Sequence, residues 1–342
     1  MALKHSSMLK SLTLAAIVST FAASSVLGQT TPPSLRPELA PAMKHLREGE
    51  HKKAVDELKQ AVKRDKTDGE AWYYLGIAYL HVSDFKKASE AFKTAIEVRP
   101  DLAAPAHAGY AYALVLRNNL ASAVGEAKKA LALDPQNIEA LYTLAIVDLR
   151  KGDKEESVRK TDTIIALKPD FAAAYLLRSQ AFVSFSGGVL YPNPNDTKEE
   201  RQADYRSAAE ALEKYLVLET DQDVAQPWKE QLETLKFYLA DKSVRSDIYV
   251  GRDVTTKVKL IAKPEPEYTQ LARSSQIVGT VVLKAVFASD GKVKHILVVQ
   301  ALPGGLTERC IAAAKRIKFN PATLNGHPVS MWMQLEYNFN LY

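Results

Sequence analysis

Small and apolar residues recur along the first two thirds of the chain at intervals of 34 or 35 residues. Two sets share this spacing, and the second follows the first by four positions: Ala54, Ala88, Ala123 and Ser157, then Leu58, Phe92, Ala127 and Thr161. Residues four apart lie on the same face of an α-helix, so each pair marks one helix at the same place in successive units. The pattern predicts an array of helical repeats in which neighbouring units bury each other's apolar faces.

The unit around Trp72 resembles a tetratricopeptide repeat, because its residues match that signature: Trp72, Leu75, Gly76, Tyr79, Ala88, Phe92, Ala95 and Pro100. The resemblance implies two helices per unit, whose small residues allow close approach. About five repeats are expected within residues 38–243, the last closed by a capping helix at 224–243. The first repeat carries Pro41 in its first helix. Residues 184–201 are rich in Gly, Pro and Asn and are predicted to form an inserted loop.

The pattern changes to alternation near the C-terminus. One set of apolar residues in the last segment occupies every second position: Val329, Met331, Met333, Leu335, Tyr337, Phe339 and Leu341. This period predicts a strand with one buried face. Earlier, residues 279–288 and 292–301 flank Asp290-Gly291 and predict a β-hairpin, and residues 306–317 predict a helix. Residues 244–257 are expected to be a linker before a second domain at 258–342.

The second domain resembles the C-terminal domain of TonB, the energy-transducing protein of Gram-negative envelopes. The matching motifs are Lys263-Pro264 to Tyr268, Ala272-Arg273, 277–281, 290–293, Ala312-Ala313, 319–322, 325–326 and 328–329. Thr269 stands where that family usually has proline, which we expect to loosen the start of the first helix. The resemblance implies two helices against a three-stranded antiparallel sheet. The expected fold is multidomain, an all-α tetratricopeptide-repeat solenoid followed by this small α+β domain.

The resemblance also implies a binding mode. In the founding members a short extended peptide from an outer-membrane transporter adds a strand beside the sheet. Here the corresponding edge is the last strand, and the residues expected to face away from the core are Trp332, Gln334, Glu336 and Asn338. Trp332 is the aromatic exception on that polar face. It is either a contact for the partner or packed under the preceding loop.

A second candidate surface is the concave face of the repeats. Tetratricopeptide repeats line this face with fixed positions of their first helices, and the matching residues are Tyr73, Ile77, Leu80, Tyr112, Tyr142, Ile146, Leu176 and Gln180. The set lacks the Lys, Asn and Arg with which some members grip a terminal carboxylate. An amphipathic helix or an apolar extended segment is therefore the expected ligand. The alternative is that these side chains pack helix on helix or beneath the chain's own insertion.

The first 28 residues have a short basic start and then 17 uncharged residues, Ser11 to Leu27. We expect a cleaved signal peptide at 1–28, a short linker at 29–37 and an exported, periplasmic protein. The alternative is an uncleaved segment that anchors the protein in the inner membrane. The net charge of +5 is too small to indicate nucleic acid.

Residues with catalytic or metal-binding potential are few. Cys310, the only cysteine, lies in an apolar helical pattern and is predicted to be a small buried residue. The seven histidines form no pair with the spacing of metal ligands, and no phosphate-binding loop or nucleophile motif occurs. The sequence therefore predicts a noncatalytic protein with no metal, no cofactor and no small-molecule substrate.

Two functions remain as hypotheses. The first is a periplasmic adaptor whose repeats and TonB-like domain each bind a protein or peptide of the cell envelope, an outer-membrane transporter among them. The alternative is a TonB-type energy transducer for outer-membrane transport. A transducer needs an anchor and a long spacer, whereas residues 29–37 span at most about 30 Å when extended. We expect the adaptor.

Overall fold

The computed structural model describes residues 37–186, 198–240 and 247–341. The chain forms two compact units that divide between Arg178 and Ser179. This division differs from the predicted one at 243–258, because the last repeat helices belong to the same unit as the C-terminal strands. The expected signal peptide and almost all of the linker at 29–37 lie outside the described residues.

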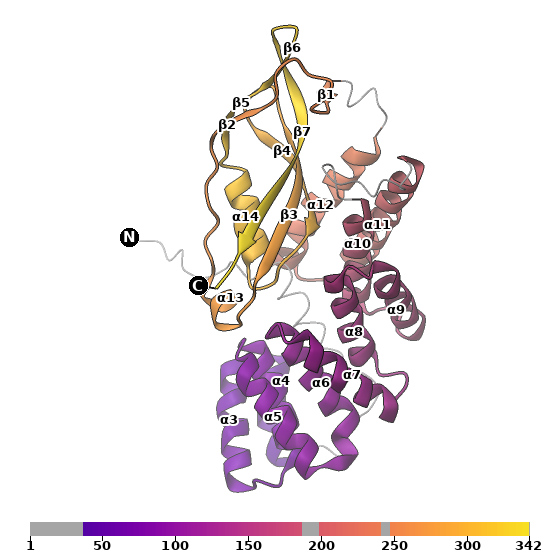
Figure 1. Ribbon diagram of the computed structural model, residues 1–342. Helices are drawn as coiled ribbons and strands as arrows, with labels where there is room; N and C mark the ends of the chain where they lie inside the picture. Colours follow the sequence, from indigo (N-terminus) through magenta and orange to yellow (C-terminus); the bar gives the residue numbers. More distant parts are fainter. Residues whose placement is uncertain (1–36, 187–197, 241–246, 342) are drawn as a thin grey trace, which may run out of the picture. The chain divides into compact units, whose positions relative to one another are not determined.

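The first unit is helical throughout its described part and confirms the repeat period (Figure 1). Each odd-numbered helix from α3 to α9 pairs with the even-numbered helix before it. The elements are η1 (Pro37–Leu39), α2 (Ala40–Arg47), α3 (His51–Arg64), α4 (Gly69–His81), α5 (Phe85–Val98), η2 (Pro100–Leu102), α6 (Ala103–Leu116), α7 (Leu120–Leu133), α8 (Ile138–Lys151), α9 (Lys154–Leu167) and α10 (Ala172–Ser186). Pro41 lies in the first turn of α2, where its missing N–H costs no hydrogen bond.

Five helices of this unit, α4, α5, α7, α8 and α9, begin with the same kind of cap. A side-chain oxygen of the residue before the helix accepts a hydrogen bond from a backbone N–H of the first turn, at Asp68, Asp84, Asn119, Asn137 and Asp153. Each cap satisfies a donor that the helix itself leaves unpaired. The recurrence of Asp or Asn at these positions therefore fixes where the helices of successive repeats begin.

Phe92 forms the contact between two repeats. Its ring is fully buried, and a Cβ added to Gly76 of α4 or to Gly109 of α6 would lie 2.7 or 2.6 Å from a ring atom. The two glycines thus admit the ring between their helices, as the sequence predicted for Gly76. The residues of both recurrent sets are likewise buried.

The second unit begins with the end of α10 and continues with α11 (Lys198–Leu218) and α12 (Gln222–Leu239). The hydroxyl of Ser179 donates to the carbonyl of Ala208 at 2.8 Å and joins α10 to α11. The predicted loop at 184–201 is too long, because residues 184–186 and 198–201 are helical. Residues 187–197 lie outside the described part of the chain. The capping helix is α12.

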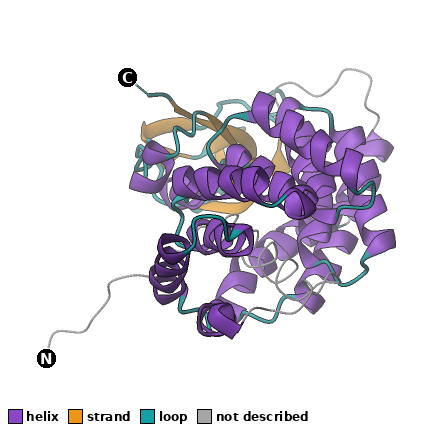
Figure 2. Ribbon diagram, turned by 90° about the horizontal axis from the view of Figure 1, so that it is seen from below, coloured by secondary structure: helices purple, strands orange, loops and turns teal. Residues whose placement is uncertain are grey.

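Every strand of the described residues lies in the C-terminal segment, from Ile248 onward. Figure 2 draws these strands in orange. They are β1 (Ile248–Tyr249), β2 (Lys259–Ala262), β3 (Gly279–Phe287), β4 (Val293–Gln300), β5 (Lys318–Asn320), β6 (Ala322–Leu324) and β7 (His327–Phe339). The main sheet has the order β1-β7-β3-β4, with β6 paired to one end of β7, and β2 pairs with β5. The long strands β4, β3 and β7 form the antiparallel sheet that was predicted, β1 and β6 extend it, and β2 and β5 form a separate pair.

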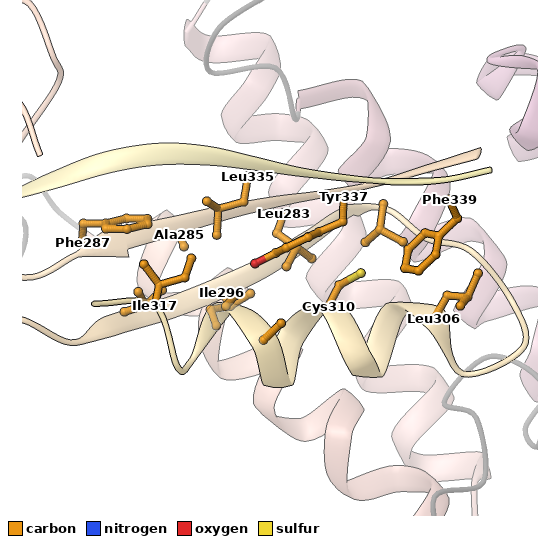
Figure 3. Packing of buried hydrophobic residues seen from close by; sticks show 14 of the residues in the cluster. Leu283, Ala285, Phe287, Ile296, Leu306, Cys310, Ile317, Leu335, Tyr337 and Phe339 are labelled. Atoms are coloured by element: carbon orange, nitrogen blue, oxygen red, sulfur yellow. The ribbon is translucent and has the colours of Figure 1, made fainter. Parts of the chain in front are cut away.

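One face of this sheet carries the apolar core. Helix α14 (Leu306–Ala314) lies against it, with Cys310 facing Leu283 and Tyr337 and Leu306 facing Phe339 (Figure 3). Cys310 is fully buried, and burial raises the pKa of its thiol to about 12. The prediction of a small buried cysteine is confirmed.

Two details of the predicted domain are wrong. The expected linker at 244–257 belongs to the domain in its described part, since Ile248 and Tyr249 pair with β7 and the N–H of Thr255 donates to the carbonyl of Thr323. Thr269 does not loosen the first helix, α13 (Gln270–Ser274). Its hydroxyl oxygen caps that helix by accepting the N–H of Ala272, which a proline could not do.

Candidate binding edge of the C-terminal sheet

Strand β7 has a strand partner along only part of its outer side. On its inner side it pairs with β3 from Met331 to Phe339. On its outer side β1 pairs with Ser330 and Met331, and β6 pairs with residues 327–329. Within the described chain no strand pairs with that side from Trp332 to Phe339. This stretch is the candidate binding edge.

Backbone groups of alternate residues point outward from this edge. The ammonium of Lys263 donates to the carbonyl of Glu336 at 2.8 Å, which shows that the Glu336 peptide groups face away from β3. Because strand orientation repeats every two residues, the N–H and carbonyl of Gln334 and Asn338 face the same way. These are the groups that an added strand would pair with.

The outward side chains at the edge are polar. Glu336 and Asn338 are exposed, and Gln334 is half-buried and donates to the Glu336 carboxylate at 2.8 Å. The Asn338 amide oxygen accepts from the hydroxyl of Thr280 on β3. Burial alternates as predicted from Leu335 to Phe339, where Leu335, Tyr337 and Phe339 are buried; before Leu335 the alternation is lost, since Ser330 is buried and Met333 is only half-buried. Leu341 lies beyond the strand and is 44% exposed.

Lys263 brings a positive charge to the edge. Its ammonium also lies 4.4 Å from the centroid of the Tyr337 ring, so the side chain reaches from the end of β2 to the edge of β7. Burial raises the pKa of the Tyr337 hydroxyl to about 12, which keeps that group neutral. Lys263 thus places one positive charge beside the Glu336 carbonyl, near the exposed Glu336 carboxylate.

Trp332 is neither an exposed contact for a partner nor packed under the preceding loop, the two alternatives that were expected. Its ring is half-buried, 4.8 Å from the Tyr238 ring and 6.1 Å from the Phe237 ring, both on α12. Helix α12 thus covers the face of the sheet opposite α14, and Trp332 packs under this helix rather than under the preceding loop. The prediction that Trp332 is an exposed contact for a partner is therefore wrong. Gln334, Glu336 and Asn338 keep their candidate role.

The eight candidate residues of the repeat groove are almost all buried. Seven have at most 9% of their surface exposed, and Gln180 is intermediate. The Tyr73 ring contacts Phe92 at a centroid distance of 5.8 Å, and the Tyr142 ring contacts Phe171 at 5.5 Å. These contacts are of the kind expected for helix-on-helix packing. The structure does not present these positions as an open surface.

One group of side chains could hold a metal ion. His45, Glu48 and Glu50 place their ligand atoms within 4.8 Å of one another, which the sequence spacing did not predict. The His45 ring already bonds to Glu50 at 2.6 Å, and Lys53 donates to Glu50 at 2.7 Å. His45, Glu50 and Lys53 therefore satisfy one another as a partly exposed hydrogen-bond network. Among the helices of the described residues, none is long and apolar enough to cross a membrane.

The sequence did not indicate a role for the residues beside the binding edge of β7 or for those beside β4, at the other end of the sheet. Lys263 was part of the quoted motif but was assigned no role. Gln231 of α12, which contacts β4, and Lys284 of β3, which contacts Tyr238, were not singled out. A charged residue in the middle of the apolar run 279–288 was the one available signal for Lys284, because an unpaired charge is rare inside a strand that is buried on both faces.

Two families match the chain. Residues 3–276 match the family described as protein kinase G tetratricopeptide repeat, and residues 264–341 match the family described as Gram-negative bacterial TonB protein C-terminal. Both resemblances inferred from sequence motifs are thereby confirmed.

Curated relatives cover a smaller part. BBSome complex member BBS4 of Bos taurus is 27% identical over 122 residues, 35% of this chain and 23% of that protein. The Mus musculus protein of the same name is 28% identical over 102 residues, 30% of this chain and 19% of that protein. The chain thus spans less than a quarter of the length of these relatives.

Several solved structures are similar to a part of the chain. The crystal structure of MamA matches 53% of this chain and 96% of its own at 21% identity, with a TM-score of 0.40. PilW, described as a widely conserved type IV pilus biogenesis factor, matches 61% of this chain and 96% of its own at 19% identity, with a TM-score of 0.43. With the family match across residues 3–276, the chain belongs to the protein kinase G tetratricopeptide repeat family, and its last 78 residues or so, 264–341, match the TonB protein C-terminal family.

Proposed function

We propose that this protein is a noncatalytic adaptor that holds an extended peptide segment of a partner as an added strand along β7. The observation that carries the proposal is the outer side of β7, where the peptide groups of Gln334, Glu336 and Asn338 face outward without a neighbouring strand among the described residues. Unpaired edge groups of this kind pair readily with another extended chain. The match to the TonB protein C-terminal family supports the same site.

Main-chain hydrogen bonds would supply most of the affinity. The outward side chains of Gln334, Glu336 and Asn338 are small or flexible polar groups, so they favour an extended backbone over a particular apolar side chain. Lys263 favours peptides with an acidic side chain. Its ammonium donates to the Glu336 carbonyl, which is also the acceptor that an N–H of the added strand would use. When the added strand displaces the ammonium from this carbonyl, the ammonium can pair with an acidic side chain of the peptide.

The repeats provide the second binding element of the adaptor. The match to a tetratricopeptide repeat family supports a protein-binding role for the repeats, at a surface other than the eight groove positions, which are almost all buried. We place the protein in the cell envelope after export, because residues 1–28 have the basic start and uncharged run of a signal peptide. Envelope proteins, outer-membrane transporters among them, are then the available partners.

The strand-addition proposal is tested with the full chain and peptides selected from a displayed random library. Proline at position 336 removes an outward N–H but leaves the pairing with β3 intact, because the bond from Lys263 to the Glu336 carbonyl shows that the Glu336 peptide groups face away from β3. We expect Glu336→Pro to weaken the selected peptides at least about 100-fold and Glu336→Ala to change their affinity less than about threefold. Circular dichroism checks that both variants are folded. Unchanged affinity in a folded Glu336→Pro variant would refute strand addition at β7.

A further inference from the structure

The sheet has a second outer edge, and helix α12 lies along it. Strand β4 ends the order β1-β7-β3-β4, so its outer side has no strand beside it in the described chain. The side chain of Gln231 occupies this side. Its amide nitrogen donates to the carbonyl of Ile296 at 3.0 Å, and its amide oxygen accepts the N–H of Val298 at 3.0 Å.

The two bonds of Gln231 reproduce what a neighbouring strand would provide. A carbonyl and an N–H two residues apart on the same side of a strand are the groups that one residue of a parallel neighbouring strand satisfies with its own N–H and carbonyl. The carboxamide of glutamine carries the same donor and acceptor as a peptide group. Gln231 is thus a one-residue substitute for a strand at the centre of the β4 edge.

Two further contacts fix α12 at this position. The Phe237 ring stacks on the His295 ring at a centroid distance of 3.5 Å and an interplanar angle of 5°, and the Tyr238 hydroxyl donates to the carbonyl of His295 at 3.4 Å. His295 has a φ of 47°, and the pairing of β4 with β3 is irregular between Lys294 and Leu297. The irregularity turns the His295 carbonyl toward the helix, so the helix binds the edge on both sides of Ile296.

The outward-facing carbonyl of Ile296 and N–H of Val298 could also pair with the same two groups of a second copy of the chain. If two β4 edges lie antiparallel with Leu297 opposite Leu297, each Ile296 carbonyl faces the Val298 N–H of the other copy. Such a pairing is isologous and closes a twofold dimer. The groups that a second copy of this chain would use are therefore the same two groups that Gln231 satisfies.

We propose that Gln231 closes the β4 edge against pairing with the β4 edge of a second copy of the chain, and so leaves β7 as the edge for partners. The closing of β4 does not depend on the proposed function of β7, although the choice between the edges rests on it. Unprotected strand edges are sites of self-association, which native proteins prevent by covering them. In this protein the last helix of the repeat array performs that task.

The test uses the full chain with Gln231→Leu, which keeps the apolar stem and removes both hydrogen bonds, and Gln222→Leu as the control. Gln222 is an exposed glutamine of the same helix, away from β4. We expect the amide hydrogen of Val298 to exchange about tenfold faster or more in Gln231→Leu, because its acceptor is lost. Sedimentation velocity should show a concentration-dependent dimer for this variant and a monomer for the control.

Neither the Val298 exchange rate nor the sedimentation measurement requires a bound peptide. Both therefore test the role of Gln231 even if no peptide binds at β7. Adding Val298→Pro to Gln231→Leu removes the N–H that a second copy would need, and we expect it to return the protein to a monomer. Unchanged exchange at Val298 in a folded Gln231→Leu variant would overturn the proposal. So would faster exchange without dimer formation, or a dimer that persists in the folded double variant.

Discussion

The ammonium of Lys284 lies 4.7 Å from the centroid of the Tyr238 ring, which joins the middle of strand β3 to helix α12. The same ammonium lies 5.7 Å from the Trp332 ring and 5.4 Å from the Tyr205 ring, and it donates to the Tyr205 hydroxyl at 3.1 Å. Three aromatic rings from two helices and a strand thus surround one cation. This arrangement holds α11 and α12 on the face of the sheet opposite α14.

Replacing this cation should weaken the second unit. Lys284→Met keeps the length of the side chain but removes the charge and the hydrogen bond, and we expect a loss of about 1–2 kcal/mol in the free energy of unfolding. Labelling of the Cys310 thiol in urea measures this, because Cys310 is the only cysteine and is buried in the same unit. Lys292→Met, at the exposed hairpin turn, is the control and should change the free energy little. An equal effect of both changes would contradict the role given to Lys284.

Phe92 should dominate the stability of the first unit. Its ring is fully buried between α4 and α6, so Phe92→Ala leaves a cavity and should cost about 3–5 kcal/mol. Urea unfolding followed by far-UV circular dichroism gives the value. A loss below about 1 kcal/mol would show that the register assigned to the repeats is incorrect.

Two helical glycines should respond to alanine with opposite sign. A Cβ at Gly109 would lie 2.6 Å from the Phe92 ring, and we expect Gly109→Ala to cost about 1–3 kcal/mol by overpacking. A Cβ at Gly125 of α7 meets nothing within 4 Å, so Gly125→Ala should stabilise by about 0.5–1 kcal/mol through helix propensity. Thermal unfolding of both variants measures the pair. Destabilisation of similar size at both positions would refute a specific contact at Gly109.

The stability of the first unit should fall in mild acid because of His81. Burial, and then the neighbouring His51 ring stacked at 3.9 Å, lower the pKa of His81 to about 3. The unfolded chain takes up this proton near pH 6.5 and the folded chain does not. The contribution of His81 is therefore complete above about pH 6.5 and declines as the pH falls toward 3, by at most about 1.4 kcal/mol per pH unit. Urea unfolding from pH 7 to pH 4.5 should show a smaller pH dependence in His81→Leu; an unchanged dependence would contradict this.

The repeats were predictable because their determinants are local and periodic. Helix starts coincide with single Asp or Asn caps, and the recurrent buried residues lie four apart on one helix face. The hairpin at Asp290 and the alternating last strand were predictable for the same reason. In each case residues close in sequence decide the structure.

The contacts of α12 could not be predicted from such patterns. Gln231 and Ile296 are 65 residues apart, and Lys284 and Tyr205 are 79 apart. In the sequence of a helix, a glutamine that bonds to a strand edge cannot be told from one that faces water, because both occur at polar positions of the helical pattern. The division of the chain before α11 and the position of Trp332 follow from these contacts, and for that reason both were missed.

The central claim, strand addition at β7, is tested most directly by amide hydrogen exchange of the full chain with and without a selected peptide. The account predicts that bound peptide slows exchange at Gln334, Glu336 and Asn338, whose N–H groups face outward, by about tenfold or more. The amides of Leu335 and Tyr337, which pair with β3, should already be slow and should change little. Protection of helix amides in the repeats, with no change at the three outward amides of β7, would contradict the account.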